Sequence, residues 1–316
     1  MTTILFDTDP GVDDTFAILL ALASPELEVD AILTVCGNVS LDVATRNALR
    51  ILTLAGRDDI AVHAGAERPL LSTALYGLHH GRDGLGGAPL PEPRARPRGQ
   101  HAVEYLIARL ESACQRGERL TLCALAPMTN IALALRIRPD ISQGIERIVA
   151  MGGAFRTPGN RTFTSEFNML ADPHAAQIVF SSGIPMTVLP LDATHQAMAT
   201  PERVARLHAI GGPLMDVLGP MLQAWDRNDP DRYGSAGGPM HDPLVTAFVL
   251  APHLFTSQAA RVMVETDAGL CRGQTVADWY GKSGEPANVD IVTKVDVEGF
   301  FDLFESGLRQ LSRVYA

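Results

Sequence analysis

The sequence predicts an α/β fold with an open, mainly parallel Rossmann-like sheet flanked by helices and a few additional antiparallel strands. Over most of the 316 residues, short apolar runs typical of buried strands alternate with segments of helical periodicity, which indicates βαβ units. The hydrophobic share of 46% is enough for a sizeable core. No shift in composition marks a boundary, so we expect residues 1–316 to form a single domain.

The first part of the chain supplies the parallel strands. Apolar runs predict strands over residues 2–7 and 29–37, and each is followed by a helix. The first helix, over 13–24, begins with carboxylates, which favour a helix N-terminus, and the second, over 41–56, ends at a glycine. The same alternation predicts further strands over 119–125, 145–153 and 184–192, and helices over 128–136 and 171–183.

The last part of the chain shows a different pattern. Thr200 followed by Pro201 predicts the start of a helix, because threonine is a good N-cap and proline fits the first helical turn. The pair Asp172 and Pro173 has the same form, and there we expect the aspartate to cap a helix. The remaining pattern predicts a hairpin over 261–266 and 273–280, a strand over 289–295 and a closing helix over 299–315.

Two stretches, 79–99 and 224–240, contain too much glycine, proline and charge for regular structure. Long loops within a compact domain are usually functional or mobile, so we expect these two to determine which ligand binds. In the second stretch, the candidates for contacting a ligand are Trp225, Arg227, Arg232 and Tyr233. The alternative is that they are ordinary loop residues.

Charge and cysteine content narrow the class of function. The net charge of −10 argues against binding the phosphate backbone of nucleic acids. The four cysteines are scattered without a CxxC spacing, which is typical of reduced core cysteines in a cytoplasmic protein. Charges, glycine or proline interrupt each apolar run before about 20 residues, so we expect no membrane span.

Four aspartates, Asp7, Asp9, Asp13 and Asp14, follow the first predicted strand within eight residues. Ligands of an open parallel sheet bind beyond the carboxyl ends of its strands. The sequence also places there Asn38, His79, His80, Asp83, Asn160, Glu166, Asn168, His241 and Asp242. Carboxylates this close need a cation or protons to coexist, and an oxygen-only donor set suits Ca²⁺ or Mg²⁺ better than zinc. The alternatives are helix capping by Asp13, Asp14 or Asp242 and turn formation by Asn38 or Asn160.

Eight short motifs stand in a fixed order along the chain: DTDPGVDD, TVCGN, HGRDGLGG, APMTN, MGGAF, GN-x-T-x3-EFN, ADP-x-AA and HDP. In this order they resemble the nucleoside hydrolase family, the Ca²⁺-dependent inosine/uridine-preferring nucleoside N-ribohydrolases. The resemblance extends from about residue 3 to the final helix. It implies the nucleoside hydrolase fold, a homodimer or homotetramer, and hydrolysis of ribonucleosides to ribose and a free base.

The resemblance also implies a role for each residue of the site. Ca²⁺ would be held by Asp9, Asp14, Asp242 and the backbone carbonyl of Leu125. Asp9 would also take a proton from the attacking water, with Asn38 bonded to Asp9 or to that water and Asp7 orienting the ligands from behind. His241 would protonate the leaving base. The other contacts to the ribose and the base would come from Asp13, His80, Met151, Asn160, Glu166 and Asn168.

Two rival functions fit part of the pattern. A phosphatase of the haloacid dehalogenase type also begins with a strand ending in DxD, but it needs a downstream lysine followed by an acidic pair. The two lysines, Lys282 and Lys294, have no fitting acidic pair after them. A nucleoside or Ca²⁺ sensor without turnover would lack Asp9 or His241, and both are present. His241 favours an enzyme that tolerates purines and pyrimidines alike.

Overall fold

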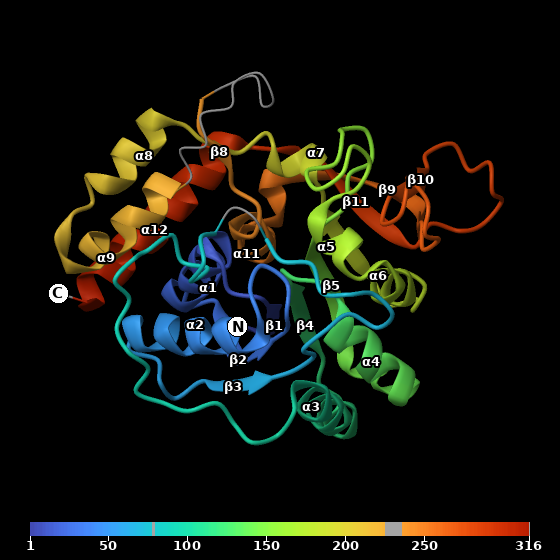
Figure 1. The fold of residues 1–316 in the computed structure, drawn as a ribbon, viewed down its shortest axis with the longest axis horizontal. Helices are drawn as coiled ribbons and strands as arrows, with labels where there is room; N and C mark the ends of the chain where they lie inside the picture. The colour runs from blue at the N-terminus through green and yellow to red at the C-terminus, as the bar shows by residue number, and fades with distance from the viewer. Residues whose placement is uncertain (78–79, 225–235, 316) are drawn as a thin grey trace.

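The computed structural model describes residues 1–77, 80–224 and 236–315 (Figure 1). Within these residues, nine strands form one sheet in the order β10-β9-β11-β6-β5-β4-β1-β2-β3. Seven are mutually parallel: β3 (Ala61–Ala64), β2 (Leu27–Thr34), β1 (Thr2–Thr8), β4 (Leu120–Ala124), β5 (Ile145–Met151), β6 (Met186–Leu189) and β11 (Val289–Val295). The other two are antiparallel, β9 (Phe255–Val264) and β10 (Thr275–Asp278).

Helices cover both faces of the sheet, because strand side chains alternate between two apolar cores. In β1, Ile4 and Phe6 belong to one core and Leu5 to the other. The first core packs against α1 (Val12–Ala23), α2 (Leu41–Leu54), α9 (Gly212–Ala224), α11 (Pro243–Leu250) and α12 (Val297–Tyr315). The second packs against α3 (Ala102–Arg116), α4 (Thr129–Ile137) and α6 (Pro173–Phe180).

Shorter elements complete the fold. In Figure 1, α8 (Pro201–His208) lies with α9 and α12 at one end of the molecule, and the β9–β10 hairpin projects from the other. The remaining elements are α5 (Phe167–Ala171), α7 (Leu191–Thr194), the 3₁₀ helices η1 (Pro139–Gly144) and η2 (Pro252–Leu254), and the paired strands β7 (Met198–Ala199) and β8 (Gly238–Pro239). No helix in the described ranges is long and apolar enough to cross a membrane.

The predicted fold class is confirmed, and so is the hairpin, since β10 pairs antiparallel with β9. The Thr200 side chain caps α8 by accepting from the Arg203 amide, as its sequence predicts. The sequence predictions lack several elements, among them β3, α3 and α9. The strand β3 has four residues, too few for a clear period, and α9 contains Pro220, which is typical of a helix break.

The sheet order places the carboxyl ends of several strands around one point. The order 3-2-1-4-5-6 reverses direction between β1 and β4, where an open α/β sheet forms a crevice for ligands. The ladder continues past the strand ends, since the Val35 amide donates to the Thr8 carbonyl and the Leu125 amide to the Asp7 carbonyl. The segments that follow β1, β2 and β4 are therefore held side by side at this crevice.

Asp172 joins three segments of the fold, and we predict that it contributes more stability than a helix cap alone. Its buried carboxylate caps α6 at the Ala175 amide (3.0 Å) and also accepts from the Leu70 amide and the Thr129 hydroxyl, both at 2.8 Å. Asp172→Ala should lower the free energy of unfolding by about 2–4 kcal/mol, because it leaves buried donors without a partner.

The matched control is Thr200→Ala, which removes only a cap and should cost about 1 kcal/mol. Chemical denaturation of the two variants measures the difference. Equal losses in both would contradict the role of Asp172 as a link between segments.

Candidate active site

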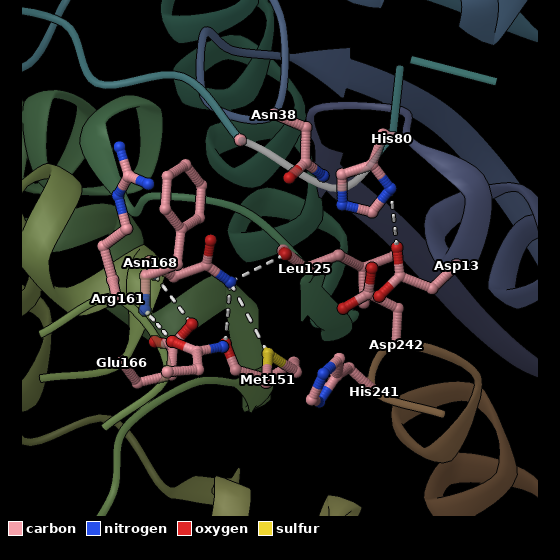
Figure 2. A pocket seen from close by; sticks show the side chains of 13 residues that line it. Asp13, Asn38, His80, Leu125, Met151, Arg161, Glu166, Asn168, His241 and Asp242 are labelled. Carbon is pink, nitrogen blue, oxygen red and sulfur yellow. Dashed lines mark hydrogen bonds and ion pairs between the residues drawn. The ribbon is translucent and has the colours of Figure 1, made fainter. Parts of the chain in front are cut away.

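A pocket of about 290 Å³ opens at the carboxyl ends of β1, β4 and β5 (Figure 2). One wall carries a carboxylate from the first turn of α1 and one from the N-cap position of α11, and the opposite wall carries residues of α5 and of the segment between β5 and α5. Its lining consists of Asp13, Asn38, Gly77, His80, Leu125, Met151, Asn160, Arg161, Glu166, Phe167, Asn168, His241 and Asp242. Most of the predicted site residues therefore lie around one cavity.

The turn after β1 brings its carboxylates together without exposing them. Asp9 and Asp14 have no exposed surface and Asp13 has 6%. Asp14 accepts hydrogen bonds from the Thr8 hydroxyl (2.5 Å) and the Gly11 amide (2.9 Å), so it closes a capping box at the start of α1. Asp14 thus has the capping role predicted as an alternative. Capping does not, however, neutralise the negative charge of the carboxylates.

Asn38 holds the Asp9 carboxylate in place. The Asn38 backbone amide donates to one oxygen of Asp9 (2.5 Å), and its side-chain amide donates to the other oxygen (3.3 Å) and to Asp14 (3.1 Å). The preceding residue must be glycine, because a Cβ atom on Gly37 would lie 1.9 Å from an Asp9 oxygen. This contact explains the sequence TVCGN after β2 and supports the predicted pairing of Asn38 with Asp9.

Asp242 reaches the cluster from a distant part of the chain. It occupies the N-cap position of α11, but its side chain makes no capping hydrogen bond, so the capping alternative is wrong for this residue. Oxygens of Asp13, Asp14 and Asp242 lie within 4.8 Å of one another. Burial, followed by repulsion from Asp13, Asp14 and Asp9, raises the pKa of Asp242 well above its usual value. Burial and neighbouring carboxylates also raise the pKa of Asp9 and of Asp14.

These carboxylates fit a metal ion. Four buried carboxylates supply oxygen ligands, which hard divalent cations prefer. The three carboxylates that converge most closely include Asp13, whereas the sequence predicts Asp9 as the third ligand. Asp9 is the carboxylate bonded to Asn38. The cluster could therefore hold a metal ion, and the division of labour between Asp9 and Asp13 stays a prediction.

Asp7 is buried near the end of β1 and does not line the pocket. Burial raises its pKa to about 7, an effect that a hydrogen bond from the Asn130 side chain (2.8 Å) partly opposes. Asn130 also donates to the Thr34 carbonyl (3.1 Å) and accepts from the Ala66 amide (2.8 Å). Asn130 thus links Asp7, near the end of β1, to the end of β2, and the predicted supporting role of Asp7 stays a prediction.

Glu166 organises the opposite wall. It caps α5, because its side chain accepts from the amides of Asn168 (2.8 Å) and Met169 (3.2 Å), and it also accepts from the Gly153 amide (3.0 Å). Burial raises the pKa of Glu166, while these backbone donors oppose the shift. The side chain of Asn160 accepts from the Phe167 amide (2.9 Å), so it is fixed beside Glu166.

Asn168 joins the two walls at the floor of the pocket. Its side-chain amide donates to the Leu125 carbonyl at 2.9 Å and to the Met151 carbonyl at 3.3 Å (Figure 2). The backbone oxygen predicted as a metal ligand, that of Leu125, therefore faces the pocket beside Asn168.

Two histidines complete the lining. Nδ1 of His241 lies 2.8 Å from the Thr194 hydroxyl, and the ring is 9% exposed. Nδ1 of His80 accepts from the Val12 amide (3.2 Å) and lies 3.7 Å from Asp13. His80 therefore contacts the acidic wall, and its predicted contact with the substrate stays a prediction.

Several residues of the site have no place in the sequence predictions. Arg161 and Phe167 line the pocket, and Thr8, Asn130 and Thr194 bond its carboxylates and His241. Arg161 lies within the GN-x-T-x3-EFN motif, and this position in the sequence could have identified it as a residue of the site. The predicted loop contacts Trp225, Arg227, Arg232 and Tyr233, and also His79, lie outside the described residues.

The profile of the inosine-uridine preferring nucleoside hydrolase family matches residues 4–302. The chain belongs to the nucleoside hydrolase family. The pyrimidine-specific ribonucleoside hydrolase RihA of Escherichia coli K12 is 42% identical over 97% of this chain and 98% of its own length. The expected family and the expected enzyme class, a nucleoside N-ribohydrolase, are thereby confirmed.

Solved structures of other nucleoside hydrolases share the fold. A purine-preferring ribonucleoside hydrolase from Gardnerella vaginalis has a TM-score of 0.89 at 31% identity and covers 99% of this chain and 100% of its own. The plant nucleoside hydrolase PpNRh1 has a TM-score of 0.88 at 32% identity and covers 97% of this chain and 98% of its own. The names of these relatives differ in the base, so membership of the family establishes the reaction and leaves the base open.

The raised carboxylate pKa values predict that the metal-free nucleoside hydrolase loses stability as pH rises. The pKa of Asp7 is about 7 in the folded state against 3.8 as its ordinary value. Between these values the folded protein holds a proton that the unfolded chain has released, so the free energy of unfolding falls with increasing pH. A divalent cation held by the neighbouring cluster would compete with such protons there, so its stabilising effect would grow with pH.

Thermal unfolding with a chelator and with Ca²⁺, from about pH 5 to pH 8, measures both trends. Asp7→Asn is the control, because it removes one buried carboxylate outside the converging group and should flatten the decline of the metal-free protein. A metal-free stability that rises with pH over this range would contradict the assignment.

Proposed function

We propose that this nucleoside hydrolase cleaves the N-glycosidic bond of ribonucleosides with Ca²⁺ bound by Asp9, Asp14, Asp242 and the Leu125 carbonyl. The observation that carries the proposal is the arrangement of the pocket, in which a buried acidic cluster faces Glu166 and Asn168 across one cavity. Neutral polar groups and carboxylates suit a sugar, and the acidic wall suits a cation that binds hydroxyl groups.

When bound, Ca²⁺ would neutralise the carboxylates, fix the ribose diol and lower the pKa of the attacking water. Asp9 would accept the proton of that water, an assignment supported by its buried carboxylate, which Asn38 holds at both oxygens. Asp13 and Asn168 would bind the 2′- and 3′-hydroxyls. Asn160 and Glu166 would bind the 5′-hydroxyl, and Met151 and His80 would contact the rest of the substrate.

The bond changes follow from these positions. The water oxygen bonds to the anomeric carbon as its proton passes to Asp9. The bond from that carbon to the base breaks, and its electron pair goes to the base nitrogen, which takes a proton from His241. Positive charge builds on the ribose in the transition state, as in glycosidases, and the surrounding carboxylates stabilise it. Solvent then returns the proton from Asp9 to His241, so the products are ribose and the free base.

The higher identity to RihA makes uridine and cytidine the first substrates to assay. The comparisons do not support the rival phosphatase or the sensor without turnover, because the matching family and the relatives named above are nucleoside hydrolases. A single domain, a homodimer or homotetramer, a cytoplasmic location and tolerance of both purines and pyrimidines stay predictions.

We predict Ca²⁺-dependent release of reducing sugar from a ribonucleoside. Uridine, cytidine, inosine and adenosine are tested with Ca²⁺ and with a chelator, beside their 2′-deoxy forms. Asp9→Ala and Asp242→Ala should each lower kcat by about a hundredfold or more, because metal-ion catalysis supplies several kcal/mol. The 2′-deoxy forms should be poor substrates, since they lack one hydroxyl of the diol.

The control for these variants is Asp216→Ala, which removes an exposed carboxylate from α9 and should leave kcat unchanged. Release of sugar from none of the ribonucleosides would refute the proposed reaction. Full activity of Asp242→Ala, or in the presence of the chelator, would refute the metal assignment.

We predict that His241→Ala lowers kcat most for substrates whose base is a poor leaving group. Loss of a general acid should lower kcat for uridine by about 10²–10⁴. A p-nitrophenyl riboside, whose leaving group needs no proton, should lose far less. Equal losses on the two substrates would argue against His241 as the acid.

A further inference from the structure

The short helix α7 contacts the segment after β5 at one end and His241 at the other. Its Asp192 accepts from three successive amides after β5, those of Phe155 (2.9 Å), Arg156 (2.8 Å) and Thr157 (3.1 Å). The segment fixed in this way leads to Asn160 and Glu166. One turn of helix therefore anchors the wall that we assign to the ribose.

The other end of α7 contacts His241. Thr194 has no exposed surface, and its hydroxyl lies 2.8 Å from Nδ1 of His241. The main chain before His241 is also hydrogen-bonded to the segment after α7. The Met240 amide donates to the Ala197 carbonyl (3.0 Å), and β7 pairs with β8. The segment after Thr194 thus fixes the main chain just before His241, and the Thr194 hydroxyl fixes the orientation of the ring.

We propose that Thr194 is a positioning residue for the leaving-group acid, His241. Because the hydroxyl contacts Nδ1, the proton delivered to the departing base comes from Nε2, on the other side of the ring. This inference rests on the proposed function, in which His241 protonates the base.

A hydroxyl suits this position chemically. Before transfer, the imidazolium carries protons on both nitrogens, and Nδ1–H donates to the Thr194 oxygen. As the glycosidic bond breaks, its electron pair goes to the base nitrogen, which takes the Nε2 proton. The neutral ring that remains keeps its proton on Nδ1 and still donates to Thr194. The same hydrogen bond therefore holds the ring before and after transfer, as a group that orients a catalytic histidine must.

Three variants test the proposal. Thr194→Val keeps the shape and removes the hydroxyl, and Thr194→Ser keeps the hydroxyl. Thr246→Val is the matched control, since Thr246 is equally buried, lies on the helix that follows His241, and donates to the Ala17 carbonyl instead (2.9 Å). Each is assayed on uridine and on a p-nitrophenyl riboside, with thermal unfolding to show that it is folded.

Thr194→Val should lower kcat on uridine by about tenfold to a hundredfold, a part of the ~10²–10⁴ that general acid catalysis contributes. It should leave KM for uridine and kcat for the p-nitrophenyl riboside nearly unchanged. Thr194→Ser should recover most of the activity on uridine, and Thr246→Val should show no selectivity between the substrates. If Thr194→Val does not fold, Thr194→Ala serves in the same comparison.

Equal losses on both substrates in Thr194→Val would overturn the proposal, and so would a Thr194→Ser variant as impaired as Thr194→Val. The same selectivity in Thr246→Val would also overturn it. Failure of the proposed function is distinguishable, because the native enzyme would then release no sugar from any riboside.

Discussion

The structure depends on the burial of several carboxylates at the end of one strand. Asp9, Asp14 and Asp242 are almost fully buried within one cluster, and this burial, followed by repulsion from neighbouring carboxylates, raises their pKa values. Backbone and side-chain donors from Thr8, Gly11 and Asn38 satisfy part of their hydrogen-bonding capacity. A bound cation would supply the missing positive charge. The absence of a side chain at Gly37 follows from the same constraint, because the turn after β2 must press against Asp9.

The sheet topology places the acidic cluster at a crevice suited to ligand binding. Because strand order reverses between β1 and β4, the acidic turn, the Leu125 carbonyl and the segment after β5 surround one crevice. Glu166 then uses its carboxylate to cap α5, which positions Asn168 over the floor. Hydrogen bonds that stabilise local structure thus also orient the residues to which we assign substrate contacts.

Much of this arrangement is predictable from the sequence, since strand–helix alternation fixes the sheet and the motifs at strand ends identify the pocket. The contact of Thr194 with His241 is not predictable from the sequence. A buried threonine in a four-residue helix has no sequence pattern that relates it to a histidine 47 residues later. The closer convergence of Asp13 than of Asp9 on Asp242 also depends on side-chain directions that spacing does not determine. Base preference is assigned to a loop whose residues 225–235 lie outside the described part of the chain.

The most direct measurement is a crystal structure of the protein with Ca²⁺ and a nucleoside analogue that resists cleavage. We expect one ion within about 2.3–2.6 Å of oxygens from Asp9, Asp14, Asp242 and the Leu125 carbonyl, with the ribose diol completing its ligands. The sugar should lie between the ion and Asn168, and the base should face His241. A cluster without an ion at millimolar Ca²⁺, or an analogue bound away from these carboxylates, would contradict this expectation.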